Sequence, residues 1–440
     1  MTKKNKVVVI GGGLTGSECA YQLLKRGVEV VLYEMKPTKF SEAHKNPNFA
    51  ELVCSNSLKS NDPLTAGGLL KEELRLLDSL LIKCADKCAV PAGSALAVDR
   101  EKFSEMITSE LKKFSNLTIK NEEIVDINQE DITIIATGPL TSMGLMTTLG
   151  KMLGEDYLYF FDAIAPIVSY ESIDFNSAFV ADRYDKGTGD YINCPMNKEE
   201  YEIFYNELIN GEIVKLKDFE NSKVFEGCMP VEVLAKRNID SLRFGPLKPV
   251  GLIDPRTGKR PYAVVQLRKE TNNNDLYNMV GFQTNLTYPE QKRIFSLIPA
   301  LKDAEFYRYG TMHKNSFVNA PKLLKNYCLN KYPNVYIAGQ LSGVEGYIES
   351  IASGLNVGLN VWQKLNGEKD IEFEPITMIG ALNNYLNAAS PEHFQPMSSN
   401  MGLINTGEIR MKDKKQKNKL LSDRALDSVK KSILDNNLEK

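Results

Sequence analysis

The chain has 440 residues, with 54 Lys and Arg against 56 Asp and Glu, and 42% of its residues are hydrophobic. This length allows two or three domains, and the composition excludes disordered, collagen-like and coiled-coil chains. The longest apolar runs have the length of a strand, far below the roughly 20 residues that cross a bilayer, so neither a membrane span nor a signal peptide is expected.

Cysteine and histidine usage bears on the cellular compartment and on metals. The seven cysteines are an odd number spread thinly over a long chain, so we expect reduced thiols in the cytoplasm rather than a disulfide framework. The three histidines, His44, His313 and His393, lie far apart, and no Cys-x-x-Cys or His-x-x-x-His pair occurs. No metal site is therefore expected.

The chain opens with the pattern of a β-α-β unit that binds a dinucleotide. An apolar strand over Lys6–Ile10 precedes a G-x-G-x-x-G turn, a helical pattern and a second strand over 28–33. The first glycine permits the tight turn, the second lets the backbone approach a pyrophosphate, and the third lets helix and strand pack closely. Glu34 follows Gly16 by 18 residues, where a carboxylate bonds a ribose hydroxyl. The residues predicted to hold the pyrophosphate are Gly11, Gly12, Gly13, Leu14, Thr15 and Gly16.

Two later strands indicate a larger cofactor. Ile132–Ile135 ends in Ala-Thr-Gly, and 335–338 ends in Gly-Gln before a Gly- and Ser-rich helix over 343–358. Loops from three strands of one sheet suit FAD, held along its whole length, better than NAD. Tyr347, between Gly346 and Ile348, is a candidate stacking residue. The further candidate cofactor contacts are Thr137, Gly138, Gly339, Gln340, Gly346 and Tyr347.

If these three strands share one sheet, the sequence between them must leave the sheet and return. We therefore predict an α/β protein with a Rossmann-like FAD-binding domain, a parallel sheet with flanking helices, over 1–165 and 325–440. An α+β insertion domain over 166–324 interrupts it. Within the insertion, the run Tyr-Ala-Val-Val-Gln-Leu over 262–267 is the clearest strand.

Positive charge is concentrated in two segments. Residues 236–269 hold nine Lys or Arg and two Asp, and residues 410–431 hold nine and three. The second segment is equally well explained as the solvated face of a helix. The first alternates basic residues with Gly, Pro, Phe244 and Tyr262, which suits phosphate contacts and base stacking. The candidate RNA-binding residues are Lys236, Arg237, Arg256, Lys259 and Arg260.

Two cysteines have loop-like, polar surroundings that favour reactivity. Cys54 lies in Leu-Val-Cys-Ser-Asn-Ser, where hydroxyls and an amide could donate hydrogen bonds to a thiolate, and Cys228 lies in Glu-Gly-Cys-Met-Pro with basic residues following. Cys84 and Cys88, spaced i and i+4 on a helical pattern, are interpreted as structural.

Together these segments resemble the folate- and FAD-dependent tRNA (uracil-5-)-methyltransferase family over nearly the whole chain. The matching stretches are 50–61, 90–100, 225–237, 258–267, 279–284 and 338–354. The phosphate turn departs from the family at its second and fifth positions, which are usually Ala. The resemblance implies FAD, its reduction by NAD(P)H, methylenetetrahydrofolate as one-carbon donor, and 5-methyluridine formed in the tRNA T-loop.

The resemblance also implies roles for the two thiols. Uracil C5 is a poor nucleophile until a thiolate adds to C6. Cys228 is the candidate attacking thiolate, and Cys54 the second thiol, which assists proton removal at C5 or protects the nucleophile.

Other functions remain open from the sequence. The same chemistry on a 23S rRNA uridine would keep every motif, and related flavoproteins modify other tRNA uridines. A small-molecule flavin oxidoreductase leaves the basic segment over 236–269 unexplained. A methyltransferase that uses S-adenosylmethionine would not need the late Ala-Gly-Gln strand. A non-enzymatic RNA-binding flavoprotein is the last alternative.

Overall fold

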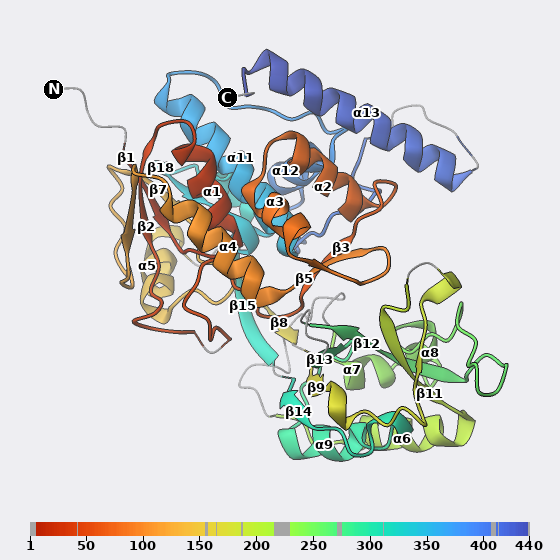
Figure 1. The fold of residues 1–440 in the computed structure, drawn as a ribbon. Coiled ribbons are helices and arrows are strands. Elements are labelled where there is room, and N and C mark those ends of the chain that lie inside the picture. Colours follow the sequence, from red (N-terminus) through yellow and green to blue (C-terminus); the bar gives the residue numbers. More distant parts are fainter. Residues whose placement is uncertain are drawn as a thin grey trace.

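The computed structural model of the protein has two parts, each built on its own sheet (Figure 1). It describes residues 6–41, 43–154, 157–163, 165–185, 188–214, 229–270, 275–310, 312–405, 411 and 413–438. The elements of the first part are β1 (Lys6–Ile10), α1 (Leu14–Leu24), β2 (Glu29–Tyr33), β3 (Ser57–Ser60), α2 (Ala66–Leu76), α3 (Leu80–Lys87), β4 (Ala89–Val90), β5 (Ala95–Val98), α4 (Arg100–Lys112), β6 (Leu117–Lys120), β7 (Ile132–Ile135), α5 (Met143–Leu153), α10 (Ala320–Leu323), β16 (Leu324–Lys325), β17 (Cys328–Leu329), β18 (Tyr332–Ile337), η6 (Gly339–Ser342), α11 (Tyr347–Leu365), α12 (Met378–Ala388) and α13 (Lys414–Asp435).

The main sheet of the first part has seven strands in the order β16-β17-β18-β7-β1-β2-β6. Strands β18, β7, β1, β2 and β6 run parallel, whereas β16 and β17 form an antiparallel edge. The three strands predicted from the sequence are neighbours at its centre, because β7 pairs with both β1 and β18. Strands β3, β5 and β4 form a small antiparallel sheet beside it. The predicted Rossmann-like class is confirmed.

Helices α1 and α11 cross closely because α11 carries two glycines one turn apart. A Cβ on Gly354 would lie 2.3 Å from the Thr15 carbonyl oxygen, and one on Gly358 would lie 2.9 Å from the Cβ of Gln22. Real side chains do not approach this closely, so only glycine permits the crossing. The first helix after the phosphate turn is thereby packed against a helix more than 300 residues later in the chain.

The second part is the predicted α+β insertion. Its sheet has the order β10-β11-β12-β13-β9-β14, and all its pairings are antiparallel. Its elements are β9 (Ile167–Ser169), η1 (Tyr170–Ser172), β10 (Phe179–Val180), η2 (Arg183–Asp185), β11 (Tyr191–Met196), α6 (Lys198–Asn210), α7 (Val231–Ala235), α8 (Ser241–Phe244), β12 (Ala263–Lys269), β13 (Leu276–Met279), α9 (Tyr288–Phe295), η5 (Pro299–Leu301) and β14 (Phe306–Arg308).

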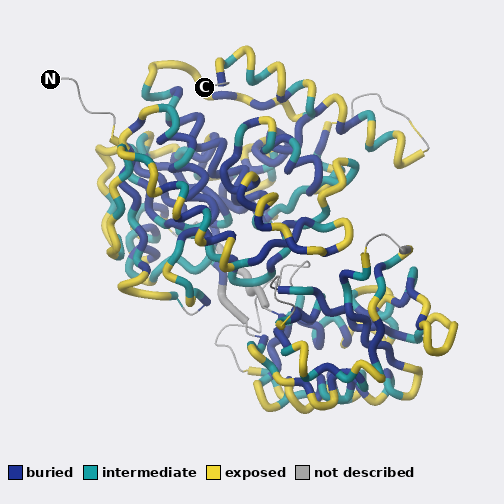
Figure 2. Tube along the Cα trace, viewed as in Figure 1, coloured by how far each residue is buried: buried dark blue, intermediate teal, exposed yellow. Residues whose placement is uncertain are grey.

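Each part has its own hydrophobic core, and Figure 2 shows the two as separate regions of buried chain. A two-stranded ribbon of β8 (Tyr157–Ala163) and β15 (Met312–Val318) lies between them (Figure 1). The two chain crossings that connect the parts are therefore paired with each other. The domain boundaries predicted from the sequence stay a prediction.

Buried carboxylates cap two helices from far along the chain. Glu73 accepts hydrogen bonds from the backbone N–H groups of Met378 and Ile379, at 2.7 and 2.8 Å, in the first turn of α12. Glu18 does the same for α3 through Leu81 N. Burial raises the pKa of Glu73 to about 7, although the two backbone hydrogen bonds act in the opposite direction.

Neither a membrane helix nor a metal cluster is found in the part of the chain that the structure describes. No helix there is long and apolar enough to cross a bilayer. Among the same residues, no three His, Cys, Asp or Glu side chains gather in a way that could hold a metal ion.

Candidate active site

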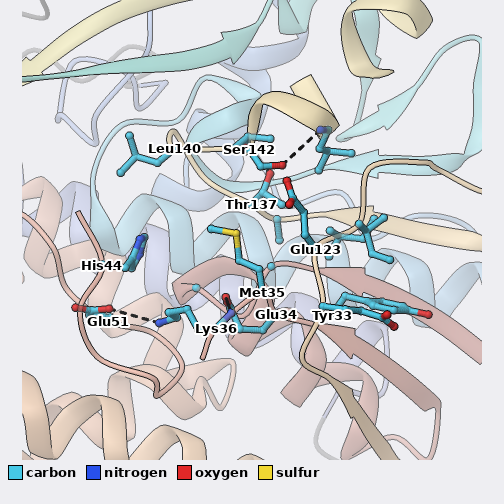
Figure 3. A pocket seen from close by; sticks show the side chains of 18 residues that line it. Tyr33, Glu34, Met35, Lys36, His44, Glu51, Glu123, Thr137, Leu140 and Ser142 are labelled. Carbon is cyan, nitrogen blue, oxygen red and sulfur yellow. Dashed lines mark hydrogen bonds and ion pairs between the residues drawn. The ribbon is translucent and has the colours of Figure 1, made fainter. Parts of the chain in front are cut away.

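A pocket opens where β1, β2 and β7 end, at the carboxyl edge of the main sheet. It holds about 660 Å³ of empty space, including the part open to solvent. Figure 3 shows Thr137, Leu140 and Ser142 on one side and residues after β2, with Glu51, on the other. The carboxyl edge of a parallel sheet is where Rossmann-like folds bind nucleotides. The lining residues are Ile10, Gly11, Gly13, Tyr33, Glu34, Met35, Lys36, His44, Glu51, Glu122, Glu123, Ile124, Ala136, Thr137, Leu140, Thr141, Ser142 and Leu145.

The glycines of the phosphate turn, residues 11–16, are required for different structural reasons. Gly11 has φ +101°, and a Cβ there would lie 2.7 Å from the Ala136 carbonyl oxygen. A Cβ on Gly16 would lie 1.9 Å from the Gly11 carbonyl oxygen. A Cβ on Gly13, in contrast, meets nothing within 4 Å. Gly11 and Gly16 are thus required because a side chain at either position would collide with the protein's own backbone. The open space over Gly13 is where a pyrophosphate could approach the backbone.

Four of the predicted cofactor residues line this pocket, namely Gly11, Gly13, Glu34 and Thr137. The Glu34 carboxylate accepts hydrogen bonds from Gly12 N at 2.9 Å and Lys36 N at 3.0 Å. Each carboxylate oxygen has a further lone pair, so a ribose hydroxyl can still be bound. Gly138 follows Thr137 with φ +68° and open space around it.

The remaining residues of the phosphate turn pack into the protein interior and hold the turn in place. Leu14 is buried in the core, and a Cβ on Gly12 would lie 2.7 Å from the Phe49 ring. Thr15 donates its hydroxyl hydrogen to the Ser350 carbonyl at 3.1 Å. A Cβ on Gly339 would lie 2.2 Å from the Thr15 hydroxyl oxygen. The phosphate turn is thus packed directly against residues 338–346, the loop between β18 and α11, which is called the late loop below. The sequence predicted that this loop shares the cofactor.

The late loop leads into the N-terminus of α11. Gln340 donates its side-chain amide to Glu345 at 2.6 Å, and Gly346, with φ +117°, precedes the helix. The hydroxyl oxygen of Tyr347 accepts hydrogen bonds from Cys54 N at 2.7 Å and Ser55 N at 3.1 Å. Burial raises the pKa of this phenol. Tyr347 therefore anchors residues 52–56, called the Cys54 loop below. The sequence did not indicate this interaction, and the predicted stacking role of Tyr347 stays a prediction.

The segment before Cys54 is tied to the phosphate turn. Ala50 N donates to the Gly12 carbonyl at 2.9 Å, and Glu51 lines the pocket. Cys54 itself is half-buried. The pyrophosphate turn, the Cys54 loop and the start of α11 are therefore brought together by direct contacts, as expected for parts of one site.

Three arginines hold the Cys54 loop, and nothing in the sequence pattern indicated them. Arg100 donates to the carbonyls of Leu52 at 2.9 Å and Cys54 at 3.3 Å, and Arg308 donates to that of Val53 at 2.9 Å. Arg268 binds the Ser55 hydroxyl at 2.7 Å and the Asn56 side-chain oxygen at 3.1 Å.

The side-chain amide of Asn56, which was expected to donate to a thiolate, donates to backbone carbonyls instead. Asn56 donates to the carbonyls of Val98 at 3.2 Å and Lys269 at 2.7 Å. That expectation was wrong, because a buried amide must satisfy both of its donors and the neighbouring strands supply the acceptors. Cys228 lies outside the described residues, two positions before Pro230, which caps α7.

The five candidate RNA-binding residues belong to two segments of the insertion. Lys236 and Arg237 follow α7, whereas Arg256, Lys259 and Arg260 line a depression beside the start of α6. Arg256 binds both carboxylate oxygens of Asp254, at 2.7 and 3.0 Å, and so stabilises its own loop.

The aromatic residues of the same segment also differ from each other. Phe244 is 80% exposed. Tyr262 is covered by Arg243, whose guanidinium lies 3.6 Å from the ring centre. Of the two rings, Phe244 is the one that is free to stack on a base.

Several pocket residues were missed by the sequence analysis. Met35, Lys36, Thr141 and Ser142 could have been found, because they follow strands that end at the same edge. His44 and Glu51 lie in a loop without a motif, and nothing in the sequence indicated them.

A nucleotide pocket next to a cysteine loop that side chains hold in place is typical of α/β flavoproteins. Comparisons with known proteins agree with this class. The model of the family "Glucose inhibited division protein A" matches residues 6–369. GidA of Aquifex aeolicus has the same fold, with a TM-score of 0.68 at 16% identity over 99% of this chain and 76% of that one.

Curated relatives give the closer relationship. The protein named methylenetetrahydrofolate–tRNA-(uracil-5-)-methyltransferase TrmFO in Acetivibrio thermocellus is 57% identical over 97% of this chain and 98% of its own length. Its namesake in Natranaerobius thermophilus is 56% identical over 97% and 99%. The chain belongs to the glucose inhibited division protein A family and, within it, to the folate- and FAD-dependent tRNA (uracil-5-)-methyltransferases.

Proposed function

We propose that the protein methylates uridine at C5 in tRNA, with methylenetetrahydrofolate as one-carbon donor and FAD reduced by NAD(P)H. The observation that carries the proposal is the joining of the open phosphate turn to the Cys54 loop, through the bond between Ala50 N and the Gly12 carbonyl. The relatives at 56 and 57% identity carry this activity in their names. The six cysteines that the structure describes are free thiols, which together with a tRNA substrate support a location in the cytoplasm.

The residues present fit FAD. Gly13 leaves room for the pyrophosphate, Glu34 has lone pairs for the ribose, and Thr137 lines the same pocket, with Gly138 next to it in the chain. Gly339, Gln340, Gly346 and Tyr347 would border the flavin. When bound and reduced, FAD supplies the reducing equivalents that turn the folate's one-carbon unit into a methyl group.

The protein's part in the reaction is activation of the base. The Cys228 thiolate forms a bond to uracil C6, the C5–C6 double-bond electrons move toward O4, and C5 becomes able to attack the one-carbon unit. Cys54 then assists removal of the C5 proton, and the C6–sulfur bond breaks with its electron pair returning to Cys228. Both cysteine roles are part of the proposal.

The insertion supplies the RNA surface. The side chains of Lys259 and Arg260 have no ion-pair partner in the described part of the chain, and with Lys236 and Arg237 they are assigned to phosphates. Phe244 is assigned to base stacking. A target uridine must lie in a loop or be flipped out, because a duplex hides C5 and C6 in the stack.

The deciding experiment is mass spectrometry of 5-methyluridine in tRNA and rRNA from cells with and without the protein. The modification should disappear from tRNA alone. Its loss from rRNA alone would replace the tRNA target with a ribosomal one and leave the chemistry intact. Unchanged levels in both would contradict the proposed function.

A second experiment tests the attacking thiol. Protein incubated with RNA that contains 5-fluorouridine should form a covalent adduct, and Cys228→Ala should form none, because the adduct needs the bond to C6. Cys328→Ala, which removes a half-buried thiol far from the pocket residues in sequence, is the matched control. An adduct retained in Cys228→Ala would transfer the role to another residue.

A further inference from the structure

Two arginines from different parts of the molecule donate hydrogen bonds to three consecutive backbone carbonyls around Cys54. Arg100, at the start of α4, takes the carbonyls of Leu52 and Cys54, and Arg308, at the end of β14, takes the carbonyl of Val53 between them. Tyr347 holds the peptide N–H of Cys54. The peptide groups on both sides of the cysteine are therefore fixed by side chains.

This arrangement brings two guanidinium groups together in a partly buried place. Burial and the charge of Arg100 both lower the pKa of Arg308. Arg100 is paired with the Glu270 carboxylate, whose oxygen lies 2.5 Å from its Nε, whereas Arg308 has no carboxylate partner among the described residues. A like-charge pair of this kind is unfavourable unless an anion lies near it.

We propose that Arg308 and Arg100 are positioning residues for Cys54, which fix its backbone and favour the thiolate form of its side chain. Glu270 offsets one of the two guanidinium charges, and the thiolate is the anion that offsets the other. Cations beside a cysteine are the usual means of stabilising a thiolate. The inference rests on the proposed function, because it gives Cys54 the basic form needed to accept a proton from C5.

The charged and titratable groups around the loop come from several elements. They are Arg100 of α4, Arg268 and Glu270 at the end of β12, Arg308 of β14, Tyr347 of α11, and His44 and Glu51 of the loop after β2. Burial lowers the pKa of His44, which opposes its protonation near neutral pH, and raises that of Tyr347. Arg100 and Arg308 therefore remain charged over the pH range of the test, and both interact electrostatically with Cys54.

The test is the rate of iodoacetamide alkylation of Cys54 against pH, read by mass spectrometry of the peptide that contains it. The protein is used with its FAD and without RNA or folate. Arg308→Gln keeps a hydrogen-bond donor but removes the charge, and Arg308→Lys keeps the charge. Arg293→Gln, which removes an exposed arginine of α9, is the matched control. Cys328, another half-buried thiol, is the reference peptide in every sample.

In the wild type, the midpoint of the Cys54 profile should lie below the ordinary thiol value of about 8.5. Arg308→Gln should raise it by about one pH unit, which slows alkylation about tenfold at pH 7, while Arg308→Lys and Arg293→Gln stay near the wild type. The Cys328 rate should be the same in all four proteins.

A wild-type midpoint at or above about 8.5 would overturn the proposal even if no variant folded. An equal shift in the Lys and Gln variants would also overturn it, because the arginine would then act through shape alone. Since the assay contains no RNA, its outcome is independent of whether tRNA is the substrate.

Discussion

The phosphate turn and the Cys54 loop lie side by side, yet they are held by opposite means. The turn is fixed by its own backbone, since a Cβ on Gly16 would overlap the Gly11 carbonyl five residues earlier. The loop is fixed by side chains that come from 46 to 293 residues away, such as Arg100, Arg308 and Tyr347. The close approach that requires Gly16 is local to the turn, whereas the contacts of the loop with Arg268 and Arg308 form only when both parts of the molecule are assembled.

The difference predicts how each region fails. A change in the turn should unfold the sheet or expel the cofactor, whereas a change at the loop should leave the cofactor in place and alter the cysteine. The two effects can therefore be separated by measuring flavin content and stability independently.

The largest effect is expected from Gly16→Ala. Its Cβ would lie 1.9 Å from a backbone oxygen that cannot move without displacing β1, so the free energy of unfolding should fall by at least about 3 kcal/mol. Gly13→Ala is the matched control, because its Cβ meets nothing. Compared without FAD in either protein, it should change stability by less than about 0.5 kcal/mol, yet it should fail to bind FAD. Denaturant unfolding and flavin absorbance measure the two; full flavin occupancy in Gly13→Ala would contradict the assignment.

Glu73 tests whether other long-range side-chain interactions behave like those of the Cys54 loop. Its folded-state pKa of about 7 is above the ordinary 4.5, so its contribution to stability is complete below pH 4.5 and is lost as the pH rises to about 7. Relative to Glu73→Gln, the wild-type free energy of unfolding should fall by up to about 3 kcal/mol across that window.

Denaturant unfolding of the Glu73 pair at pH 5 and pH 8 measures this difference. Glu130→Gln, a change at an exposed position, serves as the control. Wild type and Glu73→Gln that keep a constant difference in stability over the window would contradict the assigned shift.

Arg268→Met should weaken the connection between the loop and the insertion. It leaves the buried Asn56 oxygen without its donor, which costs about 1–3 kcal/mol. FAD should stay bound, because Arg268 does not line the pocket, but methyl transfer should fall. Arg183→Met, which breaks bonds to Gln266 and Val250 inside the insertion, should cost similar stability with methyl transfer largely kept. Equal loss of activity in both would mean that general destabilisation is the cause.

The smallest effect separates two kinds of basic residue in the insertion. Lys259→Gln with Arg260→Gln should reduce the slope of tRNA affinity against salt by about 0.9 for each phosphate that the variant no longer neutralises. Arg256→Gln should lower stability instead, because this arginine is bound to Asp254. Filter binding at several salt concentrations measures the slope, and an unchanged slope in the double variant would remove these two residues from the RNA surface.

These contrasts also explain what the sequence could predict. Strands β1, β7 and β18 were found because each is an apolar run followed within three residues by glycine, and the role of Gly16 depends on the Gly11 carbonyl five residues earlier. Gly11 instead meets the Ala136 carbonyl, which only the pairing of β1 with β7 brings near. The partners of Cys54 could not be found, because Arg268 and Arg308 reach it only through the tertiary fold. Arg256 was assigned to RNA since its charge was visible, while its bond to Asp254 depends on the shape of the loop.

The close crossing of α1 and α11 has a consequence for how the chain folds as it leaves the ribosome. The face of α1 that packs on Gly354 and Gly358 has no partner until α11 has been synthesised. At about 5–20 residues per second, this delay is on the order of tens of seconds. During that time the insertion can complete its own core, but the nucleotide-binding sheet still lacks β18. The part of the protein that comes first in the sequence is therefore expected to be the last to become stable, after the domain that interrupts it.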